Sequence, residues 1–460
     1  MFIARHFRWS FWLCMALSVS TGAAAAVPGD GEGAPRPAPA RGGAGSAAAS
    51  TLELERSLAE RASLDVIVRL ALAKNPDLVE ARERARAARE GAPASSRLPD
   101  PDFEYQLWAA PLTRPWAIGD AQMHMFGLSQ AFPAPGTLGA REDAALEQAD
   151  VAVQAERAQK LELVLRLRRA FAEYRRTDAE QRIHVEHGRL AAQVIEIARA
   201  AYQAGRGSQQ EVLRAELSAS RLHSDVLTVE AENRTARALL NVLMARPVDA
   251  PLGPPAPFDA ASAAERAATA ARQPVERPEV VAAERAISAR RHELEGVRSS
   301  GRWPSFMVGL QYMYMPMEEE PHNYGVTLSV SLPWLNPRYG EEARAAEARV
   351  AAEQSALSSS QNAVRYELYA ATERLKAARE TLTVLERGVL PQAQRSFESA
   401  QAVYRGGQGD SLALFDALQS LLDVRIEHER ALMRVEVALA EVERAAGAPR
   451  SGVVESGGKR

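Results

Sequence analysis

Four segments of the chain alternate apolar residues with polar or small ones at every second position, which is the pattern of a β-strand with two unlike faces. They are residues 103–108, 124–132, 305–315 and 324–332. In the first, Phe103, Tyr105 and Leu107 share one face. Each segment has about 7 to 11 residues, the length of a tilted strand that crosses a membrane. The pattern predicts two β-hairpins, 101–133 and 304–333, each with one apolar face.

Long segments after each hairpin place apolar residues three or four positions apart, as along one side of an α-helix. Residues 139–203 contain no proline and are rich in residues that favour helix. If unbroken, this helix would be about 100 Å long. In the matching later segment, Gly388 and Pro391 predict a bend. Helices are expected at residues 139–203, 208–245, 341–403 and 410–446. Such helices pack side by side as coiled coils.

The chain repeats itself at a spacing of about 200 residues. Residues 75–84 resemble 277–286, residues 127–133 resemble 327–333, and residues 202–207 resemble 404–409. Three matches in the same order predict an internal duplication. The first structural repeat is expected at 51–246 and the second at 275–448, joined by a Pro- and Ala-rich linker at 247–274.

The N-terminus has the composition of a secretory signal peptide. Arg5 and Arg8 precede an apolar run, and small residues ending at Ala26 fit a cleavage site. The run has about 11 residues, whereas a membrane-spanning helix needs about 20. Its Cys14 is the only cysteine, so a mature chain would have no disulfide, and lipidation of Cys14 stays open. We expect a signal peptide at 1–26, a flexible linker at 27–50 and a disordered tail at 449–460.

Composition and motifs argue against several classes of function. The net charge of −3 offers no broad basic surface for nucleic acid. No phosphate-binding loop, nucleophile elbow, zinc-protease motif or dinucleotide-binding glycine pattern occurs. We therefore expect neither an enzyme nor a cofactor. His184 and His187 lie three residues apart on a charged helical segment and are interpreted as a solvated pair rather than a metal site.

The apolar strand faces need a partner. In a soluble protein they would meet in a core, whereas in an exported envelope protein they can face lipid. Four strands cannot close a barrel, and an open edge in lipid leaves unpaired backbone groups that cost several kcal/mol each. A membrane location therefore requires several copies of the chain to combine their strands.

This arrangement resembles the TolC-like outer-membrane efflux family, and more narrowly its heavy-metal and cation efflux branch. The resemblance covers residues 60–448 and rests on the duplication, on the turns that follow Tyr202 and Tyr404, and on the stretch 407–417. It implies a mixed membrane protein in which a homotrimer forms one 12-stranded barrel, four transmembrane strands per protomer, continuous with a helical coiled-coil tunnel in the periplasm.

The resemblance also implies a location in the cell outer membrane and a set of partners. These are a periplasmic adaptor, or membrane fusion protein, and an inner-membrane pump of RND type. The protein would be a passive exit duct in a tripartite efflux system. Heavy-metal cations, drugs and polypeptides, as in type I secretion, remain alternative cargoes.

The family pattern places the helix-hairpin turns at the periplasmic tip, where acidic side chains line an aperture. The turn glycines are Gly205, Gly207, Gly407 and Gly409. Asp416 matches an aspartate of the pattern, but its counterpart in the first repeat is Arg214 and the second acidic position is Ala413. Asp410 and Glu211 lie nearby. A ring of Asp416 side chains would attract cations, whereas a solvated acid near a helix N-terminus is the alternative interpretation.

Methionines gather at the external ends of the strands in the family layout. They are Met123, Met125, Met313, Met315 and Met317, and strand alternation would turn all five toward the lumen. Residues 318–320 and His322 would occupy an external loop. Thioethers suit monovalent copper or silver, which predicts a transient contact at the pore mouth. Methionine is also a flexible filler of gaps, so an ordinary strand end is the alternative.

Two hypotheses of other classes remain from the sequence. The first is a periplasmic coiled-coil protein with a structural or interaction role, and the second is a periplasmic metal-binding protein that uses the methionines. Recovery of a trimer from outer membranes would separate the duct from both.

Overall fold

The computed structural model describes residues 53–109, 113–114, 116, 118, 121–205, 207–272, 276–406 and 411–447. These residues belong to one compact unit, Ser50–Arg460. The predicted signal peptide, the linker at 27–50 and the tail at 449–460 lie outside the described residues, as do Gly407, Gly409 and Asp410.

Long helices and four antiparallel strands make up the fold, as the sequence predicts. The first half contains α2 (Leu64–Lys74), α3 (Pro76–Gly91), β1 (Asp102–Trp108), β2 (Met123–Phe132), α4 (Thr137–Gln203) and α5 (Gln209–Leu243). The second half contains α6 (Ala260–Arg272), α7 (Pro278–Arg302), β3 (Phe306–Tyr314), β4 (His322–Val330), α8 (Arg338–Val384), α9 (Leu390–Arg405) and α10 (Ser411–Ala445).

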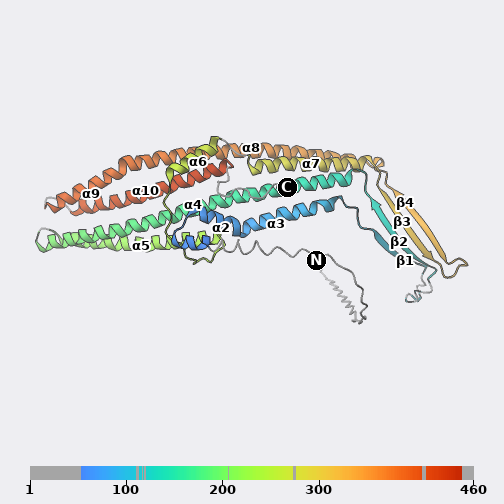
Figure 1. Ribbon diagram of the computed structural model, residues 1–460, viewed down its shortest axis with the longest axis horizontal. Coiled ribbons are helices and arrows are strands. Elements are labelled where there is room, and N and C mark those ends of the chain that lie inside the picture. The colour runs from blue at the N-terminus through green and yellow to red at the C-terminus, as the bar shows by residue number, and fades with distance from the viewer. Residues whose placement is uncertain are drawn as a thin grey trace, which may run out of the picture. The chain divides into compact units, whose positions relative to one another are not determined.

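The four strands form one antiparallel sheet in the order β1-β2-β3-β4. The two predicted hairpins join through β2 and β3, where Phe126 pairs with Tyr312. Figure 1 shows the sheet beyond one end of α4, α7 and α8, while the hairpins α4–α5 and α9–α10 extend in the opposite direction. The sheet and the hairpin turns are therefore at opposite ends of the long helices.

The helix α4 runs for 67 residues because nothing in its sequence interrupts the backbone ladder. It ends before Gly205, whose φ of +71° belongs to the left-handed region that favours glycine. Ser208 then caps α5 by accepting a hydrogen bond from the Glu211 N–H, and the Glu211 carboxylate accepts from the Ser208 N–H. A glycine followed by a capping box thus reverses the chain between two long helices.

The helix that follows β4 is interrupted partway along, so it forms two helices, α8 and α9. A π-helical turn, Leu385–Val389, separates α8 from α9 and contains Gly388, with Pro391 in the first turn of α9. Proline lacks an N–H to donate, so a wider turn before it accommodates the missing bond. The interruption coincides with the bend expected from Gly388 and Pro391.

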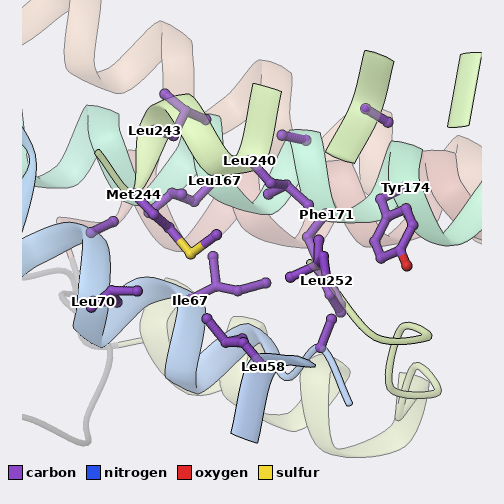
Figure 2. Packing of buried hydrophobic residues seen from close by; sticks show 14 of the residues in the cluster. Leu58, Ile67, Leu70, Leu167, Phe171, Tyr174, Leu240, Leu243, Met244 and Leu252 are labelled. Carbon is purple, nitrogen blue, oxygen red and sulfur yellow. The ribbon is translucent and has the colours of Figure 1, made fainter. Parts of the chain in front are cut away.

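The largest hydrophobic cluster holds α2 against α4 and α5. Ile67 and Leu70 of α2 meet Leu167 and Phe171 of α4, and Leu240 of α5 closes the cluster (Figure 2). Each such side chain, when fully buried, contributes about 1.5–3 kcal/mol. This cluster fixes the middle of the helical region.

One contact occurs twice, once in each half of the chain. Asn75 donates from Nδ2 to the carbonyl of Leu243 over 2.9 Å, 168 residues away. Arg277 donates from Nη1 to the carbonyl of Ala445 over 3.0 Å, again 168 residues away. Both donors stand directly before the first proline of a helix, α3 or α7. Each ties the start of one helix to the end of the last long helix of its half.

The Pro- and Ala-rich segment 247–274 contains a helix that the composition did not predict. Its helix α6 packs Ala263 and Ala267 against Val435 and Leu439 of α10. The alanines supply too weak an apolar signal to be recognised without the facing helix.

Candidate functional site: the sheet faces and the hairpin turns

The register gives the sheet two unlike faces. We call the apolar face the side formed by Phe103, Tyr105, Leu107, His124, Phe126, Leu128, Gln130, Phe132, Phe306, Val308, Leu310, Tyr312, Tyr314, His322, Tyr324, Val326, Leu328 and Val330. Phe103 and Val326 on it are 70% and 68% exposed. Large apolar side chains exposed over a whole sheet mark a surface that another phase or molecule covers.

The opposite side, the polar face, carries mainly small, polar and methionine side chains, with Trp108 at one end. Its members are Asp102, Glu104, Gln106, Trp108, Met123, Met125, Gly127, Ser129, Ala131, Met307, Gly309, Gln311, Met313, Asn323, Gly325, Thr327 and Ser329. Within the described chain, β1 and β4 are the two edges of the sheet. Each edge presents backbone groups that can pair with a strand of another molecule.

A cavity of about 1420 Å³ lies where the polar face meets α4, α7 and α8. Charged side chains of both signs line it, including Arg141, Glu293, Arg338, Glu342 and Arg349. Arg338 is paired with Glu342 at 3.0 Å. The charged residues in its lining make the space unlike a purely apolar ligand pocket.

At the end of the helices away from the sheet, the predicted aperture residues differ in their contacts. The carboxylate of Glu211 is committed to the capping box, where its Oε1 lies 3.2 Å from the Ser208 N. Arg214 and Asp416 are both exposed. Gly207 is crowded, because a Cβ there would lie 3.2 Å from the Cβ of Ala201. Any larger residue at 207 would force α4 to move by a few tenths of an ångström at this approach.

Asp416 belongs to a row of polar side chains on α10 that the sequence analysis did not identify. Asp416, Gln419, Asp423 and Glu427 line a groove of about 670 Å³ beside the π-helical turn. Gln419 donates to the Asp423 carboxylate over 2.9 Å, and Glu427 pairs with Arg434. The spacing of three or four residues was the available signal.

The methionines divide into two groups. Met125 and Met313 are directly opposite each other on the polar face of β2 and β3. The strand β3 ends at Tyr314, so Met315 and Met317 lie in the connection to β4, and Met317 is 71% exposed. The alternation argument therefore does not extend to Met317.

His322 is not in the external loop, so that expectation is wrong. It is the first residue of β4 and pairs with Tyr314. Its ring stacks on Tyr312 with centroids 6.0 Å apart, and its Nδ1 shares a hydrogen bond with the Tyr312 hydroxyl. Ring packing against two tyrosines extends the strand beyond its expected start at residue 324.

His184 and His187 are buried, so their interpretation as a solvated pair is wrong. They are 4% and 1% exposed on α4. Burial, and secondarily the charge of Arg425, lowers the pKa of His187 to about 4. No group of three or more His, Cys, Asp or Glu residues suited to a metal ion occurs in the described part of the chain.

Ion pairs join α4 to α10 along their length. Arg168 pairs with Glu443 at 2.6 Å, Glu180 with Arg430 at 3.2 Å, and Glu186 with Arg425 at 3.1 Å. Arg175 pairs with Glu436 in the same series. Burial raises the pKa of Glu436 to about 7, against the opposing effect of Arg175 and Arg168.

Comparisons with known proteins place this geometry in context. Residues 67–246 match the family described as outer membrane efflux protein. No curated protein sequence matches the chain. None of the described helices combines the length and apolarity needed to span a membrane.

Solved structures share the fold at low sequence identity. The outer-membrane channel OprN is 18% identical with a TM-score of 0.68, over 84% of this chain and 90% of that one. The outer membrane protein VceC from Vibrio cholerae is 16% identical with a TM-score of 0.69, over 84% and 96%. CusC, whose structures concern transmembrane channel formation, is 17% identical with a TM-score of 0.69, over 84% and 92%.

Proposed function

We propose that the chain is one protomer of an outer-membrane efflux channel, a passive duct that leads substrates from the periplasm or from an inner-membrane pump to the exterior. The observation that carries the proposal is the sheet, whose apolar face is exposed and whose two edges are open. The family match over residues 67–246 and the fold shared with OprN and VceC support it.

Three copies close a 12-stranded barrel in this proposal. The edge strand β1 of one copy pairs with β4 of the next, which is geometrically possible because the two edges run antiparallel in the order β1-β2-β3-β4. Closure satisfies backbone groups that would each cost several kcal/mol in lipid. The apolar face then meets lipid, and the polar face lines a water-filled lumen.

The helices continue the duct into the periplasm. The charged cavity beneath the polar face joins the lumen to the helical tunnel. The turns at Gly205 and beyond α9 form the periplasmic end, with the exposed Asp416 as the aperture carboxylate. Asp410, Glu211 and Arg214 complete the proposed aperture, although the cap made by Glu211 leaves its charge partly engaged.

The proposal includes the organisation expected from the sequence. The repeats at 51–246 and 275–448 arose by duplication, which the paired Asn75 and Arg277 contacts support. Residues 1–26 direct export, and residues 27–50 tether the chain. The segment 247–274 runs outside the tunnel.

A periplasmic adaptor and an inner-membrane pump of RND type are the proposed partners, and no catalytic step is assigned to this chain. Heavy-metal cations are the proposed cargo. Met125 and Met313, paired on the polar face, are the thioethers best placed to contact copper or silver. Drugs and exported polypeptides are the alternatives, because the pump selects the cargo.

Expression of the full chain with its own export signal tests the proposal. The expected result is a trimer in the outer-membrane fraction that resists detergent at room temperature and dissociates on heating. A monomer in the soluble periplasmic fraction would reject it and favour the coiled-coil alternative.

A further inference from the structure

His184 and His187 lie one turn apart on the side of α4 that is covered by other helices. Both are almost fully buried, at 4% and 1% exposed. Imidazole is seldom buried completely without a partner, because its ring nitrogens lose their contacts with water. The pair therefore needs an explanation beyond filling space.

Each ring leaves one buried nitrogen without a hydrogen bond. Within the described residues, Nδ1 of His184 and Nε2 of His187 have no partner. An unpaired buried polar atom costs about 1–3 kcal/mol, which a leucine at the same position would avoid. Two such atoms therefore lie about one turn apart on the same helix.

The groups around the pair disfavour a further positive charge. On α10, Arg425 faces the pair and is already paired with Glu186 at 3.1 Å. Glu427 of α10 pairs with Arg434, and Glu180 of α4 pairs with Arg430 of α10, so neither Glu427 nor Glu180 offers a free carboxylate.

Further titratable groups on the described elements beside the pair are paired or exposed. His428 of α10 is engaged with Glu386 of the π-helical turn and with Glu429. On α5, the Leu222 side chain would lie 3.7 Å from a Cβ at Gly188, the residue after His187. The titratable α5 residues beside it, Arg221, His223 and Asp225, are exposed. Glu186, Glu180 and Glu427 are already paired, so a protonated His187 would face the charge of Arg425.

The pair occupies the joint between two helical hairpins. Figure 1 shows α4–α5 and α9–α10 extending side by side away from the sheet. One turn beyond His187, Ala191 and Val194 of α4 pack against Phe397 of α9 and Leu418 of α10. The contact of α4 with α10 is thus the seam that holds the hairpins together.

We propose that this seam is an acid-sensitive joint: protonation of His187 loosens the α4–α10 contact and lets the two hairpins separate. Proton uptake by the His187 ring puts a cation beside Arg425 and favours the state in which that ring meets water. In the channel, and resting on that proposed function, separation widens the periplasmic end.

Cysteine accessibility in the full chain tests the joint. The only native cysteine, Cys14, is first changed to Ser. Val194→Cys then reports on the buried seam, and Gln210→Cys, at an exposed site of α5, reports the intrinsic rate of the reagent at each pH. The readout is the ratio of their maleimide labelling rates. This ratio removes the effect of pH on the thiol chemistry, and it tracks the population of open seam.

The expected change follows from His187. With a pKa of about 4 in the closed seam and 6.5 in water, acidification from pH 7.5 to 4.5 raises the ratio on the order of 50-fold. His184→Leu with His187→Leu should abolish the rise, and the exposed His223→Leu should leave it intact. If the double variant fails to fold, His187→Leu alone should remove most of the rise.

A ratio that does not change with pH, or that rises equally in the leucine variants, overturns the proposal. The assay needs neither a membrane nor a trimer. An acid response in a chain that forms no channel would support the acid-sensitive joint and reject the channel. A trimer without the response would support the channel and reject the joint.

Discussion

A charge placed on the apolar face should prevent assembly, whereas the same charge one residue away should not. Val326 is in the middle of β4, pairs with Leu310 and is 68% exposed. Thr327 follows it on the polar face, opposite Gly309. The substitutions Val326→Arg and Thr327→Arg therefore have the same chemistry on opposite faces of one strand.

The magnitude follows from the environment of each face. An arginine at the lipid midplane of a barrel costs about 2–4 kcal/mol, so three copies cost about 6–12 kcal/mol per trimer. Since 1.4 kcal/mol is a factor of about ten, Val326→Arg should leave less than about 1% of the chain as trimer. Thr327→Arg places its guanidinium in a water-filled lumen and should assemble as the parent chain does.

Quantitative gels of the outer-membrane fraction, run with and without heating, measure the fraction of heat-modifiable trimer. Circular dichroism of each purified variant controls for loss of the helical region. Equal trimer yields from the two variants, or a lower yield from Thr327→Arg, would refute the assignment of the faces.

Three further predictions concern other parts of the chain. A Cβ at Gly253 would lie 2.6 Å from the Glu60 carbonyl, so Gly253→Ala should destabilise the fold by about 2–4 kcal/mol. Gly139→Ala has open space around it and should not destabilise the fold. Urea unfolding followed by circular dichroism compares the two variants. The folded chain holds the pKa of Glu436 near 7, above the 4.5 of a free glutamate, so it keeps a proton that the unfolded chain releases. Stability relative to Glu436→Gln should therefore fall by about 2.5 kcal/mol from pH 5 to 8, and a difference that grows with pH would contradict the shift. Asp416→Asn should weaken block of channel current by divalent cations about tenfold, while an unchanged block would remove Asp416 from the aperture.

Strands and long helices were predictable because their signals are local. The alternation around Phe103 and Val326 needs no partner to be recognised, and a segment such as 139–203 with no proline has few alternatives to helix. The turn at Gly205 was also predictable from local sequence, since the capping box Ser208–Glu211 spans only four residues.

Features that depend on a facing element were not predictable. The burial of His184 and His187 is set by α10, which is more than 200 residues away in sequence, so their charged surroundings on α4 suggested the wrong environment. The inclusion of His322 in β4 depends on ring contacts with Tyr312. The helix α6 becomes recognisable only when the alanine side that it packs against α10 is known.

Disulfide trapping of the sheet edges tests most directly whether three sheets close one barrel. In the Cys14→Ser chain, a cysteine replaces Glu104 on β1, and a second replaces Asn323, Gly325 or Thr327 on β4 in separate variants, all on the polar face. The prediction is that one of these pairs oxidises to a covalent species that stops at three chains on non-reducing gels. Chains that remain monomeric in every pairing, or a ladder that continues beyond three, would contradict the closed trimer.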